Sequence, residues 1–173
     1  DLNKSNFESY LTEIAILKSE IKLIKKKLNK WSKPKRVKST LASFPSKDYL
    51  LLEPYGITLI ISPWNYPFQL ALLPLISSIA AGNTVVIKPS EYTPLSIMRW
   101  LQVACDHLPT GIINMITGDG VTGSYLVEHP DTRVIAFTGS VDTGKKIAMM
   151  AAKQLKKTSL ELGGNDPIII CDD

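Results

Sequence analysis

The sequence predicts an α/β protein whose core is an open parallel sheet with helices on both faces. Between Gly56 and Leu162, short apolar runs rich in β-branched residues alternate with longer runs of helical periodicity. This alternation is typical of right-handed βαβ units, which build parallel sheets. The composition agrees, because 173 residues that are 45% hydrophobic and 21% charged are enough for one domain with its own core.

The expected elements follow one another closely along this region. Strands are predicted at 56–61, 84–88, 112–116, 133–137 and 159–162. Helices are predicted between them, at 68–81, 95–108, 121–128 and 143–155. A further apolar run, 167–171, follows Asp166. Ligands of such sheets bind beyond the carboxyl ends of the strands, so the residues that follow each strand are the candidate site.

An amphipathic helix is expected before the sheet. Residues 5–8, Ser-Asn-Phe-Glu, have the form of a capping box that starts a helix. Behind it, apolar residues recur at spacings of three and four, at Ile14, Leu17, Ile21, Ile24 and Leu28. They form one stripe that faces the protein, with lysines on the opposite face. We expect the helix to end near Trp31, before Pro34.

The basic residues between 18 and 38 account for much of the net charge of +4. Such a run can bind nucleic acid or an anionic membrane. A solvated helix face is favoured, because no aromatic residues alternate with the lysines as a single-strand binder requires. Residues 33–56 are expected to be extended, with a strand within 47–54 that belongs to a hairpin pairing with another subunit.

Cysteine usage and hydropathy indicate a cytoplasmic protein. Cys105 and Cys171 have neither disulfide-framework nor metal-ligand spacing, and the chain has two histidines, so no metal site is expected. The helix at 68–81 is too short to cross a bilayer and contains Pro74. We expect neither a signal peptide nor a membrane segment.

The turn after the first strand carries the most informative side chain. Residues 61–68 read Ile-Ser-Pro-Trp-Asn-Tyr-Pro-Phe, so Asn65 stands in a turn fixed by two prolines. An amide at the end of a parallel strand can donate a hydrogen bond to an oxygen on which charge develops. Asn65 could instead cap the following helix. This stretch alone does not separate the two interpretations.

Two glycine motifs follow later strands. Gly118, Gly120 and Gly123 fit G-x-G-x-x-G, but the next strand does not end in the acidic residue of a dinucleotide fingerprint. We interpret these glycines as a strand–helix turn near a cofactor, not as a pyrophosphate cradle. Residues 139–146 differ from a P-loop by one position, where Lys146 replaces the Mg²⁺-binding Ser or Thr. Backbone N–H groups at this helix N-terminus would still suit a phosphate.

Two carboxylates stand at other strand ends. Glu91 follows Lys88 by three residues, and together they can hold a ribose diol, because a carboxylate accepts from hydroxyl groups and an ammonium donates to them. A surface ion pair is the simpler explanation of this pair alone. Glu161 precedes the flexible pair Gly163–Gly164 and could be a general base, or only a turn-flanking residue.

Taken together, these segments resemble the aldehyde dehydrogenase superfamily, and the wording of 63–68 resembles its class 3, fatty-aldehyde-type branch. The matching segments are 63–67 (PWNYP), 81–91 (AGNTVVIKPSE), 137–140 (FTGS) with Gly144, and 160–164 (LELGG). The resemblance implies a Rossmann-like cofactor domain and NAD-dependent oxidation of an aldehyde to a carboxylic acid, with NADP as the alternative cofactor. A cysteine thiolate would attack the aldehyde, hydride would pass to nicotinamide, and water would hydrolyse the thioester.

The resemblance also assigns roles to individual residues. Asn65 would be the oxyanion donor and Glu161 the base that activates water. Lys88 and Glu91 would hold the adenosine ribose. The remaining cofactor-binding positions that it implies are Trp64, Ser90, Gly120, Gly139, Ser140, Gly144, Leu162 and Gly163.

The resemblance further implies a division of the chain and an incomplete catalytic centre. Residues 1–39 would be a helical arm, 40–56 part of an oligomerisation element, 57–164 the cofactor domain and 165–173 the start of a catalytic domain. The parent enzyme would be a homodimer or higher oligomer. The family's nucleophile follows a few dozen residues after the LELGG motif, whereas this chain ends at Asp173. We therefore expect an N-terminal portion that is inactive alone.

Neither cysteine of the chain is expected to replace that nucleophile. Cys105 is predicted to be buried within a helix, and Cys171 comes too soon after Glu161. The alternative functions are a nucleotide-binding module without catalysis and a P-loop-type NTPase, the latter disfavoured by Lys146.

Overall fold

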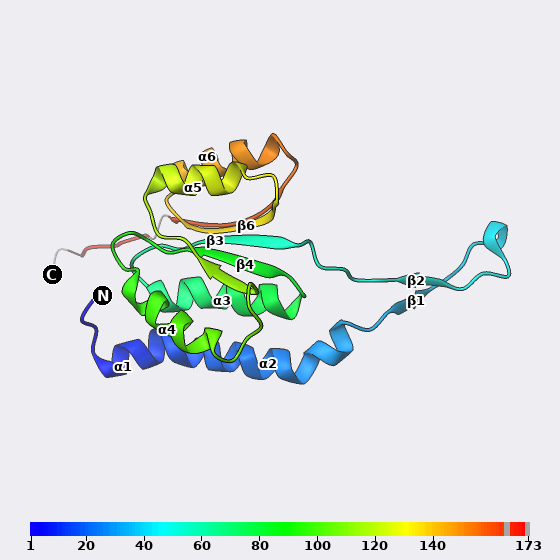
Figure 1. Ribbon diagram of the computed structural model, residues 1–173, viewed down its shortest axis with the longest axis horizontal. Coiled ribbons are helices and arrows are strands. Elements are labelled where there is room, and N and C mark those ends of the chain that lie inside the picture. The colour runs from blue at the N-terminus through cyan, green and yellow to red at the C-terminus, as the bar shows by residue number, and fades with distance from the viewer. Residues whose placement is uncertain (165–166, 172–173) are drawn as a thin grey trace.

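The computed structural model describes residues 1–164 and 167–171 and has the predicted α/β architecture (Figure 1). All strands of its main sheet are parallel, in the order β5-β4-β3-β6-β7. Their bounds are β3 Ile57–Ile61, β4 Thr84–Lys88, β5 Ile113–Met115, β6 Thr132–Gly139 and β7 Lys157–Leu162. The five strands predicted from the sequence are therefore confirmed, with differences only at their ends.

Helices cover both faces of this sheet, as predicted (Figure 1). One face is covered by α3 (Pro67–Ala80) and α4 (Leu95–Cys105), and the other by α5 (Gly120–Glu128) and α6 (Val141–Ala152). Two predicted ends were wrong, because α4 stops three residues before Leu108 and α6 stops before Leu155. Leu155 takes a left-handed φ of 53°, which no α-helix continues through.

The order of the strands creates a crevice at one end of the sheet. From β3 the chain moves through β4 to β5, and α5 then returns it to β6 on the other side of β3. The adjacent strands β3 and β6 consequently send their connections to opposite faces, one to α3 and the other to α6 (Figure 1). Such a switch point is where open α/β sheets bind their ligands.

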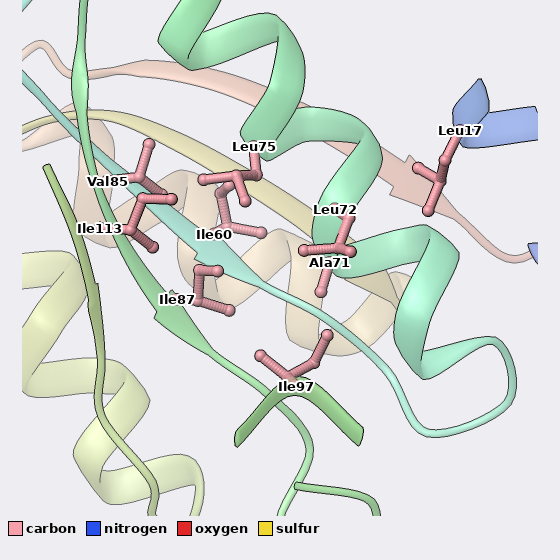
Figure 2. Close-up of a cluster of buried hydrophobic side chains, with 9 residues drawn as sticks. All are labelled: Leu17, Ile60, Ala71, Leu72, Leu75, Val85, Ile87, Ile97 and Ile113. Carbon is pink, nitrogen blue, oxygen red and sulfur yellow. The ribbon is translucent and has the colours of Figure 1, made fainter. Parts of the chain in front are cut away.

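Two apolar clusters hold the layers together, one on each face. Figure 2 shows the first, in which β-branched residues of β3, β4 and β5 meet α3 and α4. Its fully buried members include Ile60, Val85, Ile87 and Ile97. The second cluster packs Leu59, Ile135 and Phe137 of the sheet against α5 and α6. Burial on both faces explains why these strands read as continuous apolar runs.

The N-terminal helix packs on α3. It consists of α1 (Asn6–Ser9), a π-helical turn at Tyr10–Ile14 and α2 (Ala15–Trp31). The Ser5 half of the predicted capping box is confirmed, because the Ser5 hydroxyl accepts a hydrogen bond from the Glu8 amide at 3.1 Å. The predicted stripe is only half right: Leu17 and Ile24 are buried, whereas Ile14 and Ile21 are 36% and 43% exposed.

The reason for this difference is that one narrow line of the helix touches α3. Buried residues recur seven apart, at Leu17 and Ile24, and the next buried position towards the N-terminus is a carboxylate, Glu13. A stripe counted from apolar residues alone could not include it.

A hairpin extends away from the sheet (Figure 1). It pairs β1 (Lys35–Val37) with β2 (Asp48–Leu50) in antiparallel register. The predicted strand within 47–54 is thus present, and its partner lies in the same chain; pairing with another subunit stays a prediction. No helix within residues 1–164 or 167–171 is both long and apolar enough to span a membrane. Asp166 lies outside the described residues, and 167–171 have no regular secondary structure.

Candidate nucleotide and aldehyde site

A cavity of about 520 Å³ opens beyond the carboxyl ends of β3, β4 and β6. Residues that follow β4 form one wall, and the start of α6 with one side of α5 forms another. Most residues predicted to bind a cofactor line this cavity, namely Trp64, Lys88, Ser90, Glu91, Gly120, Gly139 and Ser140. Segments that are far apart in the sequence therefore converge at the switch point.

Lys88 and Glu91 form an ion pair of unusual burial. Their Nζ and Oε2 atoms are 3.6 Å apart, and the side chains are 5% and 46% exposed. The Lys88 ammonium also donates to the Pro89 carbonyl at 3.3 Å. Gly123 of α5 lies against the lysine stem, where a Cβ would be 3.6 Å from Cδ. A buried cation beside an accessible carboxylate offers a donor and an acceptor to a diol, which a solvated surface pair would not do as well.

The N-terminus of α6 is the better of two candidate anion sites. Ser140 is its N-cap and accepts a hydrogen bond from the Thr143 amide at 3.3 Å. At the start of α5, by contrast, the Asp119 carboxylate accepts from the Val121 and Thr122 amides at 3.0 and 3.1 Å. Those hydrogen bonds, chiefly that of Thr122, lower the pKa of Asp119. Its negative charge disfavours an anion there, so α6 with its neutral cap suits a phosphate.

The strand–helix junction at α6 also argues against a P-loop. Only Ser140 separates the end of β6 at Gly139 from the first residue of α6, Val141. A P-loop wraps phosphates with several loop residues between strand and helix. The NTPase alternative therefore has no structural support here.

Ser62 is a site residue that the sequence argument missed. It is 4% exposed, lines the 520 Å³ cavity, and its Oγ has no hydrogen-bond partner among the described residues. Buried hydroxyl groups nearly always have a partner, so an unsatisfied one in a cavity wall fits a bound polar molecule. The only signal in the sequence was its position directly after a buried strand.

A second cavity of about 350 Å³ adjoins the first. It is lined by Asn65 and Glu161, the two predicted catalytic residues, together with Leu162 and Gly163. Glu161 reaches it from β7, where it pairs in register with Thr138 of β6. Pro63, Trp64, Thr138 and Gly139 line both cavities. A ligand in one cavity would therefore touch the wall of the other.

Asn65 does not cap α3, which corrects one of the two interpretations of this residue. The N-cap of α3 is Tyr66, and no side chain of the turn supplies a capping bond. Instead, Glu13 of the N-terminal helix accepts from the Phe68 and Gln69 amides at 2.8 and 3.1 Å. The Asn65 side chain is exposed and has no hydrogen bond within the part of the chain that is described. Its amide is free to donate to a ligand.

Gly144 and Cys105 lie elsewhere than the sequence suggested. Gly144 is buried beneath Leu162 and does not line the first cavity; a Cβ there would be 2.4 Å from Leu162 Cδ2. Its role is to let α6 approach the end of β7. Cys105 was predicted to be buried, but it is the last residue of α4 and is exposed. Neither Cys105 nor Cys171 lines either cavity.

The fold and these two adjoining cavities define a Rossmann-like α/β domain with a crevice placed and sized for a dinucleotide. Comparison with known proteins gives its family. The model of the aldehyde dehydrogenase family matches residues 6–173. The chain belongs to the aldehyde dehydrogenase family.

Its relatives include members of class 3, as the sequence of residues 63–68 suggested. The chain is 42% identical over 170 residues to a 4,4'-diaponeurosporen-aldehyde dehydrogenase of Staphylococcus aureus, covering 98% of this chain and 37% of that protein. It is 38% identical over 173 residues to aldehyde dehydrogenase family 3 member H1 of Arabidopsis thaliana, covering 100% and 36%. The chain thus spans a little over a third of these curated relatives.

Solved structures agree with this assignment. The substrate-bound state of Staphylococcus aureus AldH superposes with a TM-score of 0.83 at 42% identity, covering 95% of this chain and 36% of that one. PnpE of Pseudomonas sp. WBC-3, in complex with nicotinamide adenine dinucleotide, gives a TM-score of 0.78 at 34% identity, covering 86% and 30%.

Proposed function

We propose that this chain forms the dinucleotide site, and half of the reaction site, of a protein that oxidises an aldehyde to a carboxylic acid. One observation carries the proposal: the cavity with the Lys88–Glu91 pair and the cavity with Asn65 and Glu161 share a wall at the switch point. A cofactor and a substrate must lie side by side for a hydride to pass between them. The shared wall provides that arrangement.

The first cavity suits NAD, with NADP as the alternative. Glu91 would accept from the ribose hydroxyls while Lys88 donates to them, and the N-terminus of α6 would face the pyrophosphate. The unpartnered Ser62 hydroxyl supplies a further polar group in the wall. The bound dinucleotide would serve as the hydride acceptor. The nicotinamide adenine dinucleotide complex of PnpE supports the choice of ligand.

In the second cavity, Asn65 and Glu161 have complementary tasks. The Asn65 amide would donate a hydrogen bond to the aldehyde oxygen as negative charge develops on it. The Glu161 carboxylate would take a proton from the water that hydrolyses the acyl intermediate. The nucleophile would come from another part of the whole protein, since neither cysteine of the chain lines the cavity. Catalysis is therefore proposed for the whole protein.

The remaining features of the organisation are proposals of the same kind. We propose that residues 57–164 form the cofactor domain, 1–39 its helical arm, 40–56 part of an oligomerisation element and 165–173 the start of a catalytic domain. The exposed hairpin supports a homodimer or higher oligomer. The cysteine usage supports a cytoplasmic location.

Titration of this chain with NADH, NADPH and ATP–Mg²⁺ tests the proposed ligand. We expect NADH to bind and to quench the fluorescence of Trp64, which is 54% exposed in the shared wall. Lys88→Met should weaken binding about 10-fold or more, since a lost hydrogen bond to a charged group costs about 1.5–3 kcal/mol. Lys153→Met, at an exposed pair with Glu128, is the matched control and should change nothing.

Binding of ATP–Mg²⁺ without NADH or NADPH would overturn the dinucleotide assignment. The module without catalysis remains the second candidate, and a different measurement decides it. If the complete protein binds NADH but oxidises no aldehyde, short or long, the catalytic part of the proposal is wrong.

A further inference from the structure

Glu13 is a buried carboxylate that the proposed chemistry does not use. It is 6% exposed, lies in the π-helical turn between α1 and α2, and contacts the start of α3. A buried charge is costly unless it is paired and hydrogen-bonded. The structure satisfies both oxygens of Glu13, and both sets of bonds lead to the turn that carries Asn65.

One oxygen replaces the missing cap of α3. Pro67 is the first residue of α3 and has no N–H, so the next two amides, of Phe68 and Gln69, begin the unpaired set. Glu13 Oε2 accepts from both, at 2.8 and 3.1 Å. A carboxylate at a helix N-terminus is also favoured by the helix dipole. Glu13 therefore holds the downstream end of the turn.

The other oxygen is connected to the middle of the turn through Lys4. Glu13 Oε1 accepts from Lys4 Nζ at 2.9 Å, and the two side chains are 7% and 14% exposed. The same Nζ donates to the Asn65 carbonyl at 2.7 Å and lies 4.1 Å from the centre of the Tyr66 ring. The bonds run without interruption from the α3 amides through Glu13 and Lys4 to the backbone of Asn65.

This arrangement matters for Asn65, whose side chain has no hydrogen bond of its own among the described residues. The direction of its amide therefore depends on the backbone on either side of it. We propose that Glu13 and Lys4 are positioning residues for the aldehyde site, which hold the 62–68 turn so that Asn65 faces Glu161. This proposal rests on the proposed function, because it assumes that Asn65 takes part in the reaction.

Hydrogen exchange measures the positioning itself, whatever the reaction. In this chain, Glu13→Ala should speed exchange of the Phe68 and Gln69 amides by about 10-fold or more, because both donate to Glu13 and would lose their acceptor. Lys4→Met should speed exchange of the same two amides by less, because it removes only the ion-pair partner of Glu13. Glu20→Ala is the matched control: Glu20 is half-buried on the same helix, and it lines a separate groove of about 370 Å³ with Ile24 and Leu28. It should leave exchange in the turn unchanged.

Kinetics of the complete protein measure the consequence. We expect Glu13→Ala to lower kcat roughly 10²-fold, the effect of moving a catalytic group by about 1 Å. The Kd for NADH should change much less than kcat, because Lys88, Glu91 and the start of α6 line the first cavity outside the turn, which contributes only Ser62, Pro63 and Trp64. Glu13→Gln keeps one oxygen for the α3 amides, and it should recover part of the loss.

A double-mutant cycle separates positioning from general destabilisation. Once Asn65→Ala has removed the amide, Glu13→Ala should cost little more activity, because coupled residues are not additive. Additive losses, or an unchanged kcat accompanied by a lower Tm, would overturn the proposal. The proposal would also be overturned if Glu13→Ala left the exchange rates of the turn amides unchanged. If the wild-type protein binds no dinucleotide and oxidises no aldehyde, the proposed function fails, and the exchange result still decides whether Glu13 holds the turn.

Discussion

At the scale of single residues, burial decides which polar groups are informative. Lys88 and Glu13 are ordinary charged residues in the sequence, but the structure buries both and gives each a specific set of partners. Asn65 and Glu161 are exposed, and the roles proposed for them depend on their lining the same cavity. The chemical role of a side chain thus follows from its surroundings more than from its type.

Glu91 is expected to favour NAD over NADP. Its accessible carboxylate, 3.6 Å from Lys88, would repel the 2′-phosphate of NADP while accepting hydrogen bonds from the NAD ribose. In Glu91→Gln the ratio of the two Kd values should move towards NADP, about 10-fold or less because Lys88 remains. Both Kd values are measured by titration of the same protein, with Glu128→Gln on the far surface as control. A ratio that stays constant would place Glu91 away from the ribose.

At the scale of elements, the starts of the helices distinguish the two glycine turns. Helix α5 begins with a charged cap, Asp119, and α6 begins with a neutral one, Ser140. Both turns match glycine motifs of nucleotide sites, although the sequence favours a phosphate only at 139–146. The cap is what separates them, since a carboxylate already occupies the positive end of α5.

Asp119 is expected to make stability depend on acid pH. The Thr122 amide lowers the pKa of Asp119 in the folded state, so its contribution is present above about pH 3.9, the unfolded value, and is lost as pH falls through the lowered folded value. Asp119→Ala should lower Tm at pH 7, and the gap to wild type should narrow in strong acid. Asp119→Asn keeps an uncharged cap and should lose less at pH 7. A gap of constant size down to low pH would contradict this.

At the scale of the whole molecule, the chain spans little more than a third of its relatives, and we propose that it carries a cofactor site and part of a reaction site. It covers 36% and 37% of its curated relatives in class 3 and in Staphylococcus aureus. Its hairpin strands expose apolar residues, with Tyr49 and Leu50 each more than half accessible. The edge strand β7 is also mostly exposed. These surfaces suggest how the chain behaves by itself.

We expect this chain alone not to oxidise aldehydes. Asn65 and Glu161 line the second cavity, but Cys105 and Cys171, both exposed, do not. An NADH-production assay with short and long aldehydes should show no turnover above the protein-free rate. Cys105→Ser and Cys171→Ser should behave the same. Turnover that either substitution abolishes would mean that the chain uses a nucleophile of its own.

The isolated chain is also expected to self-associate. Unpaired strand edges and exposed apolar side chains favour contacts between copies. Sedimentation at increasing concentration should show species larger than a monomer, and Tyr49→Lys combined with Leu50→Lys should reduce them. A single monomeric species for the wild-type chain at high concentration would rule this out.

By itself, the sequence determined the parallel α/β sheet, its five strands and the strand-end residues that gather at the switch point. It could do so because apolar periodicity is local and because parallel strands always bring their carboxyl ends to one edge. Only the tertiary structure decided which of these residues share a cavity, that the Asn65 side chain has no hydrogen bond to residues 1–164 or 167–171 and does not cap α3, and that Cys105 is exposed.

The role of Glu13 also came only from the structure. Two of its partners, the Phe68 and Gln69 amides, lie more than fifty residues further along the chain, at 2.8 and 3.1 Å. From the sequence alone, a glutamate on a helix is expected to be exposed to solvent. No spacing pattern in the sequence indicates a hydrogen-bond partner more than fifty residues away. These long-range hydrogen bonds form only because the N-terminal helix packs on α3.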